Sequence, residues 1–336
     1  MSIGIVDNEV HPDASVLANI TWHRPLLWLS IAMAALAVLS VVGLLIDSRI
    51  LTGVPIWSKP LKFAISILLY SLTLSWLIGL LQRWRRIAWW AGTIAAVFLA
   101  VEIVIIAGAA ASGMTSHFNV STPFATALWA VMAVSIVIVW SAALPIAVLL
   151  FRAKLGDPAR SLAIRAGFII ALIGMALAFL MTSPTAGQLS NFRGIAGAHT
   201  VGLADGGPGL PLLGWSTVAG DLRIPHFVGM HALQLIPIAA LLIELLSRRI
   251  PVLLSASTRV AIIRVLVVLY LGILALLTGQ ALIGQSIVRP DPSILTIAAA
   301  LCGGAAAAIG GVIVRSYLAE RLQGQKDRVP FVATRR

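Results

Sequence analysis

Charged residues are scarce in this sequence. Only 11% of the 336 residues are Asp, Glu, Lys or Arg, whereas 60% are hydrophobic, and the mean hydropathy is +1.00. A soluble globular protein is nearer half apolar and about a quarter charged. So few charges cannot cover this apolar surface in water, which excludes a soluble globular protein and predicts that lipid surrounds much of the chain.

Cysteine is almost absent as well, because Cys302 is the single one. A disulfide within the chain is therefore excluded, as are a CxxCH haem attachment and any cysteine-rich metal site. Cys302 lies inside an apolar segment, where we interpret it as a small residue that helps helices pack.

Several catalytic motifs are missing too. The sequence lacks GxxxxGK[ST], HExxH and GxSxG, and no GxGxxG opens a helix after a strand. These absences exclude a P-loop ATPase, a zincin and an α/β-hydrolase. The net charge of +12 does not indicate nucleic-acid binding, because the basic residues form no stripe interleaved with aromatics.

Eight long apolar segments are present instead. About 20 apolar residues cross a hydrocarbon core of about 30 Å, and each segment reaches that length. The sequence predicts an all-α, polytopic integral membrane protein with a transmembrane domain at 26–316, a tail at 1–25 without a cleavable signal, and a basic tail at 317–336. The predicted helices lie near 26–46, 61–81, 87–111, 124–151, 160–182, 225–246, 260–284 and 293–316.

Lys and Arg alternate between the two ends of these segments. Of the 24 basic residues, 18 fall in the tails and in every second loop, and six fall in the other loops. Cytoplasmic loops of membrane proteins carry such an excess, so both termini are predicted to be cytoplasmic. The overall character resembles that of bacterial integral membrane proteins, and we expect a multi-pass protein of a bacterial plasma membrane.

Small residues within the segments predict close helix packing. Gly167 and Gly174 lie in the fifth segment, and the eighth contains four glycines around a run of alanines. Helices in lipid associate where small side chains let their backbones approach.

The loop at 183–224 is the longest, with nine glycines. Loops of this length are usually functional or disordered. Leucines and Trp215 are threaded through this one, so we expect an ordered extracytoplasmic lid that includes Asp205. Asp221 and Arg223 flank the start of the next helix, where an Asp can cap exposed N–H groups.

The second segment begins with a polar, aromatic stretch. Trp57 fits the aromatic belt of a membrane protein, and Lys59 and Lys62 are expected to extend to the outer interface. Tyr70 and Thr73 belong to a polar stripe that should face other helices.

Histidines gather at the predicted outer end. Four of the six map there, namely His117, His199, His226 and His231. His226 and His231 are five residues apart, so on a helix they point about 140° from each other and cannot chelate one metal ion together. Each needs partners from other segments. His11 and His23 lie in the N-terminal tail, where we expect them to be solvated.

Glu102 is an ionisable residue inside the third apolar segment, about 14 Å below its outer end. A charge at such depth is disfavoured by about 2.5–3.5 kcal/mol on insertion scales and indicates function by default. His231 lies about 9 Å below the outer end of its helix, so the two meet if these helices are neighbours. Glu244, near the opposite end, is expected to pair with Arg248 one turn later.

Three functions fit these residues. The leading hypothesis is a redox protein that binds haem b, copper or iron through a site made of His117, His226, His231, His199 and Glu102. The alternative is a proton-coupled transporter of a small solute, with a relay of Glu102, His231 and Gln234. The third is an accessory subunit of a membrane complex. Substrate, cofactor, partner subunit and oligomeric state stay open.

Overall fold

A computed structural model describes residues 20–326 of the chain. Within them, eight helices are long and apolar enough to cross a membrane, which confirms the predicted number and the predicted all-helical, multi-pass class. These helices are α2 (Arg24–Ile46), α3 (Ser58–Gly79), α4 (Arg85–Ala111), α5 (Pro123–Arg152), α6 (Pro158–Ala176), α8 (Arg223–Leu246), α9 (Ala256–Leu282) and α10 (Pro292–Lys326).

Short elements connect them. The 3-10 helix η1 (Leu177–Met181) continues α6, and α7 (Ala186–Ser190) and η2 (Pro251–Leu253) are single turns. Two antiparallel pairs of two-residue strands complete the list: β1 (Ile50–Leu51) with β2 (Val54–Pro55), and β3 (Thr200–Val201) with β4 (Gly220–Asp221).

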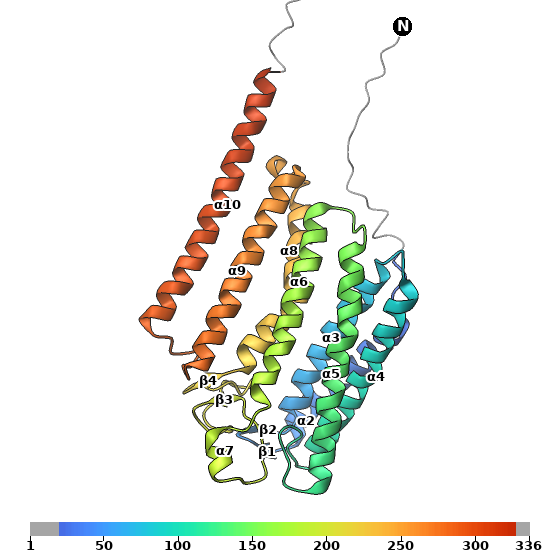
Figure 1. Ribbon diagram of the computed structural model, residues 1–336, viewed down its shortest axis with the longest axis vertical. Coiled ribbons are helices and arrows are strands. Elements are labelled where there is room, and N and C mark those ends of the chain that lie inside the picture. Colours follow the sequence, from blue (N-terminus) through green and yellow to red (C-terminus); the bar gives the residue numbers. More distant parts are fainter. Residues whose placement is uncertain (1–19, 327–336) are drawn as a thin grey trace, which may run out of the picture.

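The two ends of the bundle differ (Figure 1). One end carries the start of α2, the end of α10 and the α3–α4, α5–α6 and α8–α9 connections, and we call it the basic end. The other carries the β1–β2 hairpin, the α4–α5 loop, the α9–α10 loop and the long loop at 182–222, and we call it the long-loop end. Successive membrane-length helices therefore run in opposite directions, as the distribution of basic residues requires.

Local capping sets several helix starts. Thr122 accepts the backbone N–H of Ala125 ahead of α5, and Asp157 accepts that of Ala159 ahead of α6. Pro follows the cap directly in both helices, where its missing N–H is not needed. These caps place the starts one or two residues before the predicted apolar segments.

Helix α10 extends ten residues past its predicted end at 316. Hydropathy falls there, but the added residues include Ala, Leu, Glu, Arg and Gln. These are strong helix formers, so the helix continues after the apolar residues that would cross the membrane have ended.

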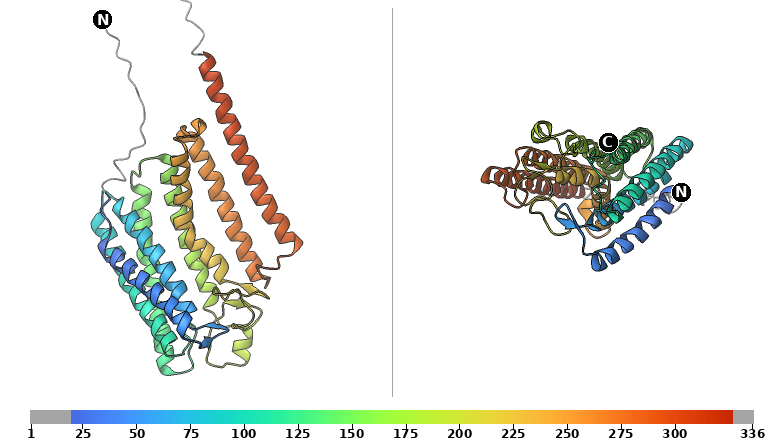
Figure 2. Two further views of the ribbon diagram at one scale, coloured as in Figure 1. Left: turned by 180° about the vertical axis from the view of Figure 1, so that it is seen from behind. Right: turned by 90° about the horizontal axis from the view of Figure 1, so that it is seen from below.

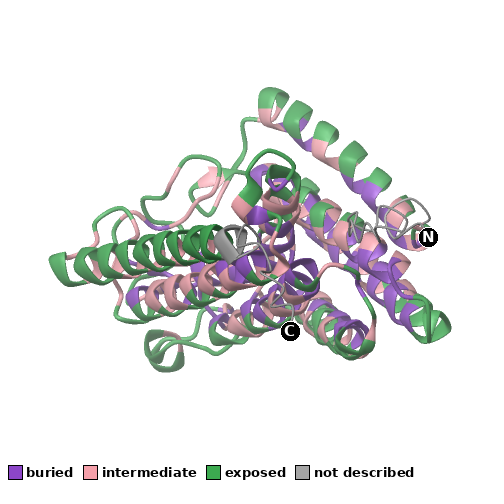
Figure 3. Ribbon diagram, turned by 90° about the horizontal axis from the view of Figure 1, so that it is seen from above, coloured by how far each residue is buried: buried purple, intermediate pink, exposed green. Residues whose placement is uncertain are grey.

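The helices pack in two groups of four. Helices α2 to α5 form one group, and α6, α8, α9 and α10 form the other; contacts of α5 with α6 and of α3 with α8 join them. Helix α10 stands at the edge opposite α2 and α4 (Figure 2), packs mainly on α9 and is exposed along almost its whole length (Figure 3). This exposure suits contact with lipid.

Glycines give α6 and α8 their close approach. A Cβ atom added to Gly174 would lie 2.3 Å from the carbonyl carbon of Gly229, and one added to Gly167 would lie 2.7 Å from the carbonyl oxygen of Ala232. The predicted packing role of these glycines is confirmed. The glycines of α10 differ, because an added Cβ would meet nothing within 4 Å in the described chain at Gly303, Gly304, Gly310 and Gly311.

Ion pairs tie the helices together at the basic end. Arg160 of α6 holds Glu244 of α8 through two hydrogen bonds, and Arg259 of α9 donates to Asp157 at 2.6 Å. The predicted pairing of Glu244 with Arg248 was therefore wrong. The bidentate guanidinium of Arg160, brought close by the α6–α8 contact, takes the carboxylate instead.

Replacing Gly174 with Ala should destabilise the protein, because the new Cβ would overlap the backbone of α8. Overpacking of this kind typically lowers the free energy of unfolding by about 1–3 kcal/mol. We expect a lower melting temperature for the detergent-solubilised protein. Gly303→Ala is the matched control, since its Cβ meets open space. Equal melting of the two variants would contradict the α6–α8 contact.

Candidate functional site at the long-loop end

The α4–α5 loop pairs with the long loop and brings two of the histidines together. The backbone N–H of Ala196 donates to the carbonyl of Phe118 at 2.8 Å. The ring of Phe118 then lies between two imidazoles, with its centroid 6.0 Å from that of His117 and 4.9 Å from that of His199. Phe118 itself has a φ of 62°, a strained conformation for a bulky residue that the surrounding contacts must hold.

Asp205 fixes the position of His199. Its carboxylate accepts the backbone N–H groups of His199 and Thr200 and lies 2.5 Å from Nδ1 of His199. Burial lowers the pKa of His199 despite this partner. Burial raises the pKa of Asp205, but the hydrogen bonds from His199 and Thr200 outweigh it and hold that pKa well below its usual range. A neutral His199 therefore donates through Nδ1 and keeps a lone pair on Nε2.

His226 lies close to His199. The N–H of Leu222 donates to the carbonyl of His199 at 2.9 Å, and His226 follows one helical turn later on α8. Nδ1 of His226 lies 2.7 Å from the carbonyl oxygen of Gly174. A carbonyl can only accept, so Nδ1 carries the proton and Nε2 keeps the lone pair, as in His199.

His117 is bound to a lysine. Nζ of Lys59 lies 3.1 Å from Nδ1 of His117, and Oγ of Ser116 lies at the same distance. Burial and then the charge of Lys59 lower the pKa of His117 well below its usual range. The imidazole is therefore neutral and accepts at Nδ1 from the ammonium group. The rings of Phe63 and Trp129 pack on it, with centroids 5.5 and 5.6 Å away.

Glu102 lies within the electrostatic field of the same lysine. The residue is 5% exposed, and its Oε2 atom is buried without a hydrogen-bond partner among the described residues. The predicted meeting of Glu102 with His231 is not found. Helix α3 packs against both α4, which carries Glu102, and α8, which carries His231.

His231 belongs to a polar seam between α3 and α8. Its Nδ1 lies 3.2 Å from Oε1 of Gln234, and Nε2 of Gln234 donates to Oγ1 of Thr73 at 3.2 Å. The predicted stripe of Tyr70 and Thr73 does face another helix. Nε2 of His231 and the hydroxyl of Tyr70 are both buried without a partner in this part of the chain.

Unpartnered buried polar atoms are concentrated along α3. In the described chain, those on α3 or on side chains that interact with it belong to Ser58, Tyr70, Ser71, Glu102 and His231, while Ser40 and Arg259 hold the remaining two. Buried polar groups in proteins nearly always have hydrogen-bond partners. Three of these side chains, those of Ser58, Tyr70 and Ser71, stand on α3 itself.

The long loop is held to the helices by charged side chains. The buried carboxylate of Asp221 accepts the N–H groups of Ser216 and Arg223 and pairs with the Arg223 guanidinium at 2.5 Å. It thus holds the first N–H of α8, although the N-cap residue is Leu222, which has no side-chain cap. Lys62 donates to the carbonyl of Leu213 at 2.6 Å. The head groups of Lys59 and Lys62 thus bind loops of this chain rather than reaching freely outwards.

The two tryptophans singled out by the sequence have packing roles. Trp57 donates from Nε1 to Asp47 at 2.8 Å, and its ring lies against Gly43 of α2. Trp215 packs edge-to-face on Phe227 of α8, with a centroid distance of 5.6 Å. Both stand at the long-loop end, as predicted.

The described residues offer few side chains that could bind one metal ion together. Residues 20–326 contain no group of three or more His, Cys, Asp or Glu side chains arranged to hold a metal ion. Phe118 contacts both His117 and His199, and the His199 carbonyl bonds Leu222, one turn before His226, whereas His231 bonds Gln234 in the α3–α8 seam. The redox hypothesis stays a prediction. Its simplest form is a site in which two histidines bind the metal or the haem iron.

His23 is buried rather than solvated. His23 is 2% exposed, accepts the N–H of Leu26 at Nδ1 and lies 2.9 Å from the carbonyl of Trp89 through Nε2. The prediction of a solvated His23 was wrong. Its position directly before an Arg-Pro helix start was the available signal for a cap. His11 lies outside the described residues.

No protein family, no curated protein and no solved structure matches this chain. Its function must therefore be argued from its own residues.

The His199–Asp205 contact should make the long loop sensitive to acid. Both pKa values are lowered in the folded protein, so the folded state binds fewer protons and loses stability as the pH falls below about 6.5, the usual pKa of His. The protection factors of the His199 and Thr200 amides, that is, their exchange relative to the intrinsic rate at each pH, should fall from pH 7 to pH 5.

Asp205→Asn should accelerate the same amides already at pH 7, on the order of tenfold, because it removes a charged acceptor. Asp291→Asn is the control, since Asp291 caps α10 through Ile294 at the same end of the bundle. Unchanged exchange in Asp205→Asn would show that this carboxylate does not hold the loop.

Proposed function

We propose that this chain is a proton-coupled transporter of a small solute in a bacterial plasma membrane. The basic end faces the cytoplasm, because 18 of the 24 basic residues belong to the terminal segments and to the helix connections of this end. The long loop at 182–222 then covers the opposite, outer end as a lid. Lipid surrounds the exposed apolar faces of the eight helices.

Glu102 beside Lys59 carries the proposal. A buried carboxyl with an unpartnered oxygen lies within the field of a lysine, inside a segment long and apolar enough to span the bilayer. Ionisable residues at such positions mark ion, proton or substrate paths in membrane proteins. A carboxyl required only for packing would have hydrogen-bond partners at both oxygens.

Lys59 gives the carboxyl a way to act on the site. The ammonium group lies 3.1 Å from Nδ1 of His117 and within the electrostatic field of the Glu102 carboxyl. When Glu102 is ionised, it attracts Lys59; when it is protonated, the hydrogen bond to His117 retains the ammonium group. Protonation of Glu102 therefore changes the position of the Lys59 ammonium group. A solute that contacts Lys59 then binds with a different affinity.

The helix arrangement supports movement around this point. The two groups of four helices meet through α5 with α6 and through α3 with α8, and the polar seam of Thr73, His231 and Gln234 lines the second contact. A polar interface between two helix groups offers a path for a solute and a plane along which the groups can rock.

Glu102→Gln should abolish coupled flux while the protein stays folded. The test uses proteoliposomes that contain a pH-sensitive dye and a panel of amino acids, monocarboxylates and sugars. Wild-type protein should dissipate a pH gradient with at least one class, and Glu102→Gln should fall to the background of protein-free liposomes.

Glu320→Gln is the matched control, because it removes an exposed carboxyl from α10. It should keep the wild-type flux. Wild-type flux in Glu102→Gln, or no proton movement by wild type with any member of the panel, would count against the transporter.

A redox site is a second candidate, and the tautomers of two histidines favour it. Nδ1 is engaged by Asp205 in His199 and by the Gly174 carbonyl in His226, which leaves Nε2 of both as a ligand atom. Metal-bound histidines have this pattern of outer hydrogen bonds. His199 and His226 would hold a haem, copper or iron centre, with His117 and Glu102 nearby. Such a group would supply one-electron transfer.

The redox candidate predicts a Soret band or stoichiometric metal in protein purified from cells grown with haem precursor, iron and copper. His226→Ala should remove the signal. His231→Ala should retain it, because His231 bonds Gln234 in the α3–α8 seam instead. A colourless, metal-free wild-type preparation would contradict this candidate.

A further inference from the structure

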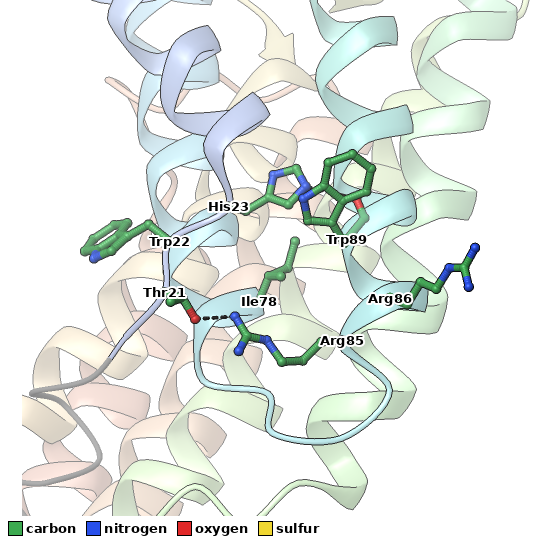
Figure 4. Close-up of a pocket in the computed structure, with 7 residues that line it drawn as sticks. All are labelled: Thr21, Trp22, His23, Ile78, Arg85, Arg86 and Trp89. Atoms are coloured by element: carbon green, nitrogen blue, oxygen red, sulfur yellow. Dashed lines mark hydrogen bonds between the residues drawn. The ribbon is translucent and has the colours of Figure 1, made fainter.

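A pocket opens at the basic end, opposite the candidate site at the long-loop end (Figure 4). It has a volume of about 280 Å³ and lies between the residues that precede α2, the end of α3 and the first turn of α4. Its walls are formed by Thr21, Trp22, His23, Ile78, Arg85, Arg86 and Trp89.

Positive charge dominates the pocket. Arg85 reaches across it and donates to Oγ1 of Thr21, while Arg86 extends outwards from the rim (Figure 4). Both arginines stand in the first turn of α4, which has no acidic residue and no side-chain cap from Trp84. The start of a helix carries partial positive charge and free N–H groups, so helix and guanidinium groups favour the same kind of ligand, an anion.

The part of the pocket wall formed by His23 is neutral and is held in place by hydrogen bonds. His23 uses Nδ1 to cap α2 and holds the carbonyl of Trp89 through Nε2, which ties α2 to α4. Burial lowers the pKa of His23, so it adds no charge of its own. The pocket is thus a preformed cavity whose positive charge comes from Arg85 and Arg86.

The surroundings favour a lipid. Trp22 and Trp89 are 42% and 41% exposed at the rim, and tryptophan is enriched where a bilayer meets water. Exposed apolar side chains continue from the pocket along α2 and α4, among them Trp28 and Val97. A headgroup in the pocket would leave its acyl chains against these faces.

We propose that this pocket binds the phosphate group of an anionic phospholipid, with Arg85 as its main ligand. A phosphate diester accepts two hydrogen bonds from one guanidinium group, and basic pockets between transmembrane helices on the cytoplasmic side suit such headgroups. Trp22 covers the glycerol part at the rim.

Native mass spectrometry of the delipidated full chain in detergent tests this. Phosphatidylglycerol, phosphatidylcholine and inorganic phosphate are added separately. Phosphatidylglycerol should bind on the order of tenfold tighter than phosphatidylcholine, and Arg85→Gln should weaken it by about tenfold. Arg248→Gln is the control, because it removes an equal charge from an exposed position at the same end; its affinity should stay within about twofold of wild type.

Trp22→Ala tests the pocket without removing a charge and should also weaken binding of phosphatidylglycerol. Arg85-dependent binding of inorganic phosphate without binding of phosphatidylglycerol would assign the pocket to free phosphate and overturn the lipid. Wild-type affinity for phosphatidylglycerol in both Arg85→Gln and Trp22→Ala, or an equal loss in Arg248→Gln, would overturn the pocket as a phosphate site.

Discussion

Hydrocarbon offers no hydrogen bonds, and this constraint decides how the polar groups of the chain are arranged. The backbone of each spanning segment satisfies its own hydrogen bonds within a helix. A serine or threonine can bond a carbonyl one turn earlier, as Thr278 does with Leu274, but a longer polar side chain needs a partner on another helix or loop. Arg160 finds Glu244, Gln234 finds Thr73 and Lys59 finds His117. Where this requirement is not met, as at Glu102, the exception calls for a functional explanation.

Charged side chains have different structural roles at the two ends of the bundle. At the basic end, Asp157 and Glu244 pair with arginines of neighbouring helices and fix how α6, α8 and α9 pack. At the long-loop end, Asp205 and Asp221 accept several backbone N–H groups and order a loop rich in glycine. These four carboxylates have clear structural partners, which separates them from Glu102, whose Oε2 atom has no hydrogen-bond partner within residues 20–326.

The position of α3 links the structure to the proposed function. It lies between α4 and α8, so it contributes to both helix groups and separates Glu102 from His231. Lys59 at its start interacts with Glu102 on one neighbour and His117 on a loop, while Thr73 contacts α8 through Gln234. A helix with polar contacts on both sides can transmit the protonation of one carboxyl to the contact between the two groups.

Hydropathy and charge are properties of each segment alone, so the eight helices, their alternation and the four histidines at one end could be predicted from the sequence. Which groups meet could not be predicted, because it depends on how the helices pack. Glu244 bonds Arg160 rather than Arg248, Glu102 lies in the field of Lys59 and is not found with His231, and His23 is buried. Each outcome depends on which helices are neighbours. No local sequence pattern predicts the neighbours, because helices in lipid associate through the fit of whole helix faces.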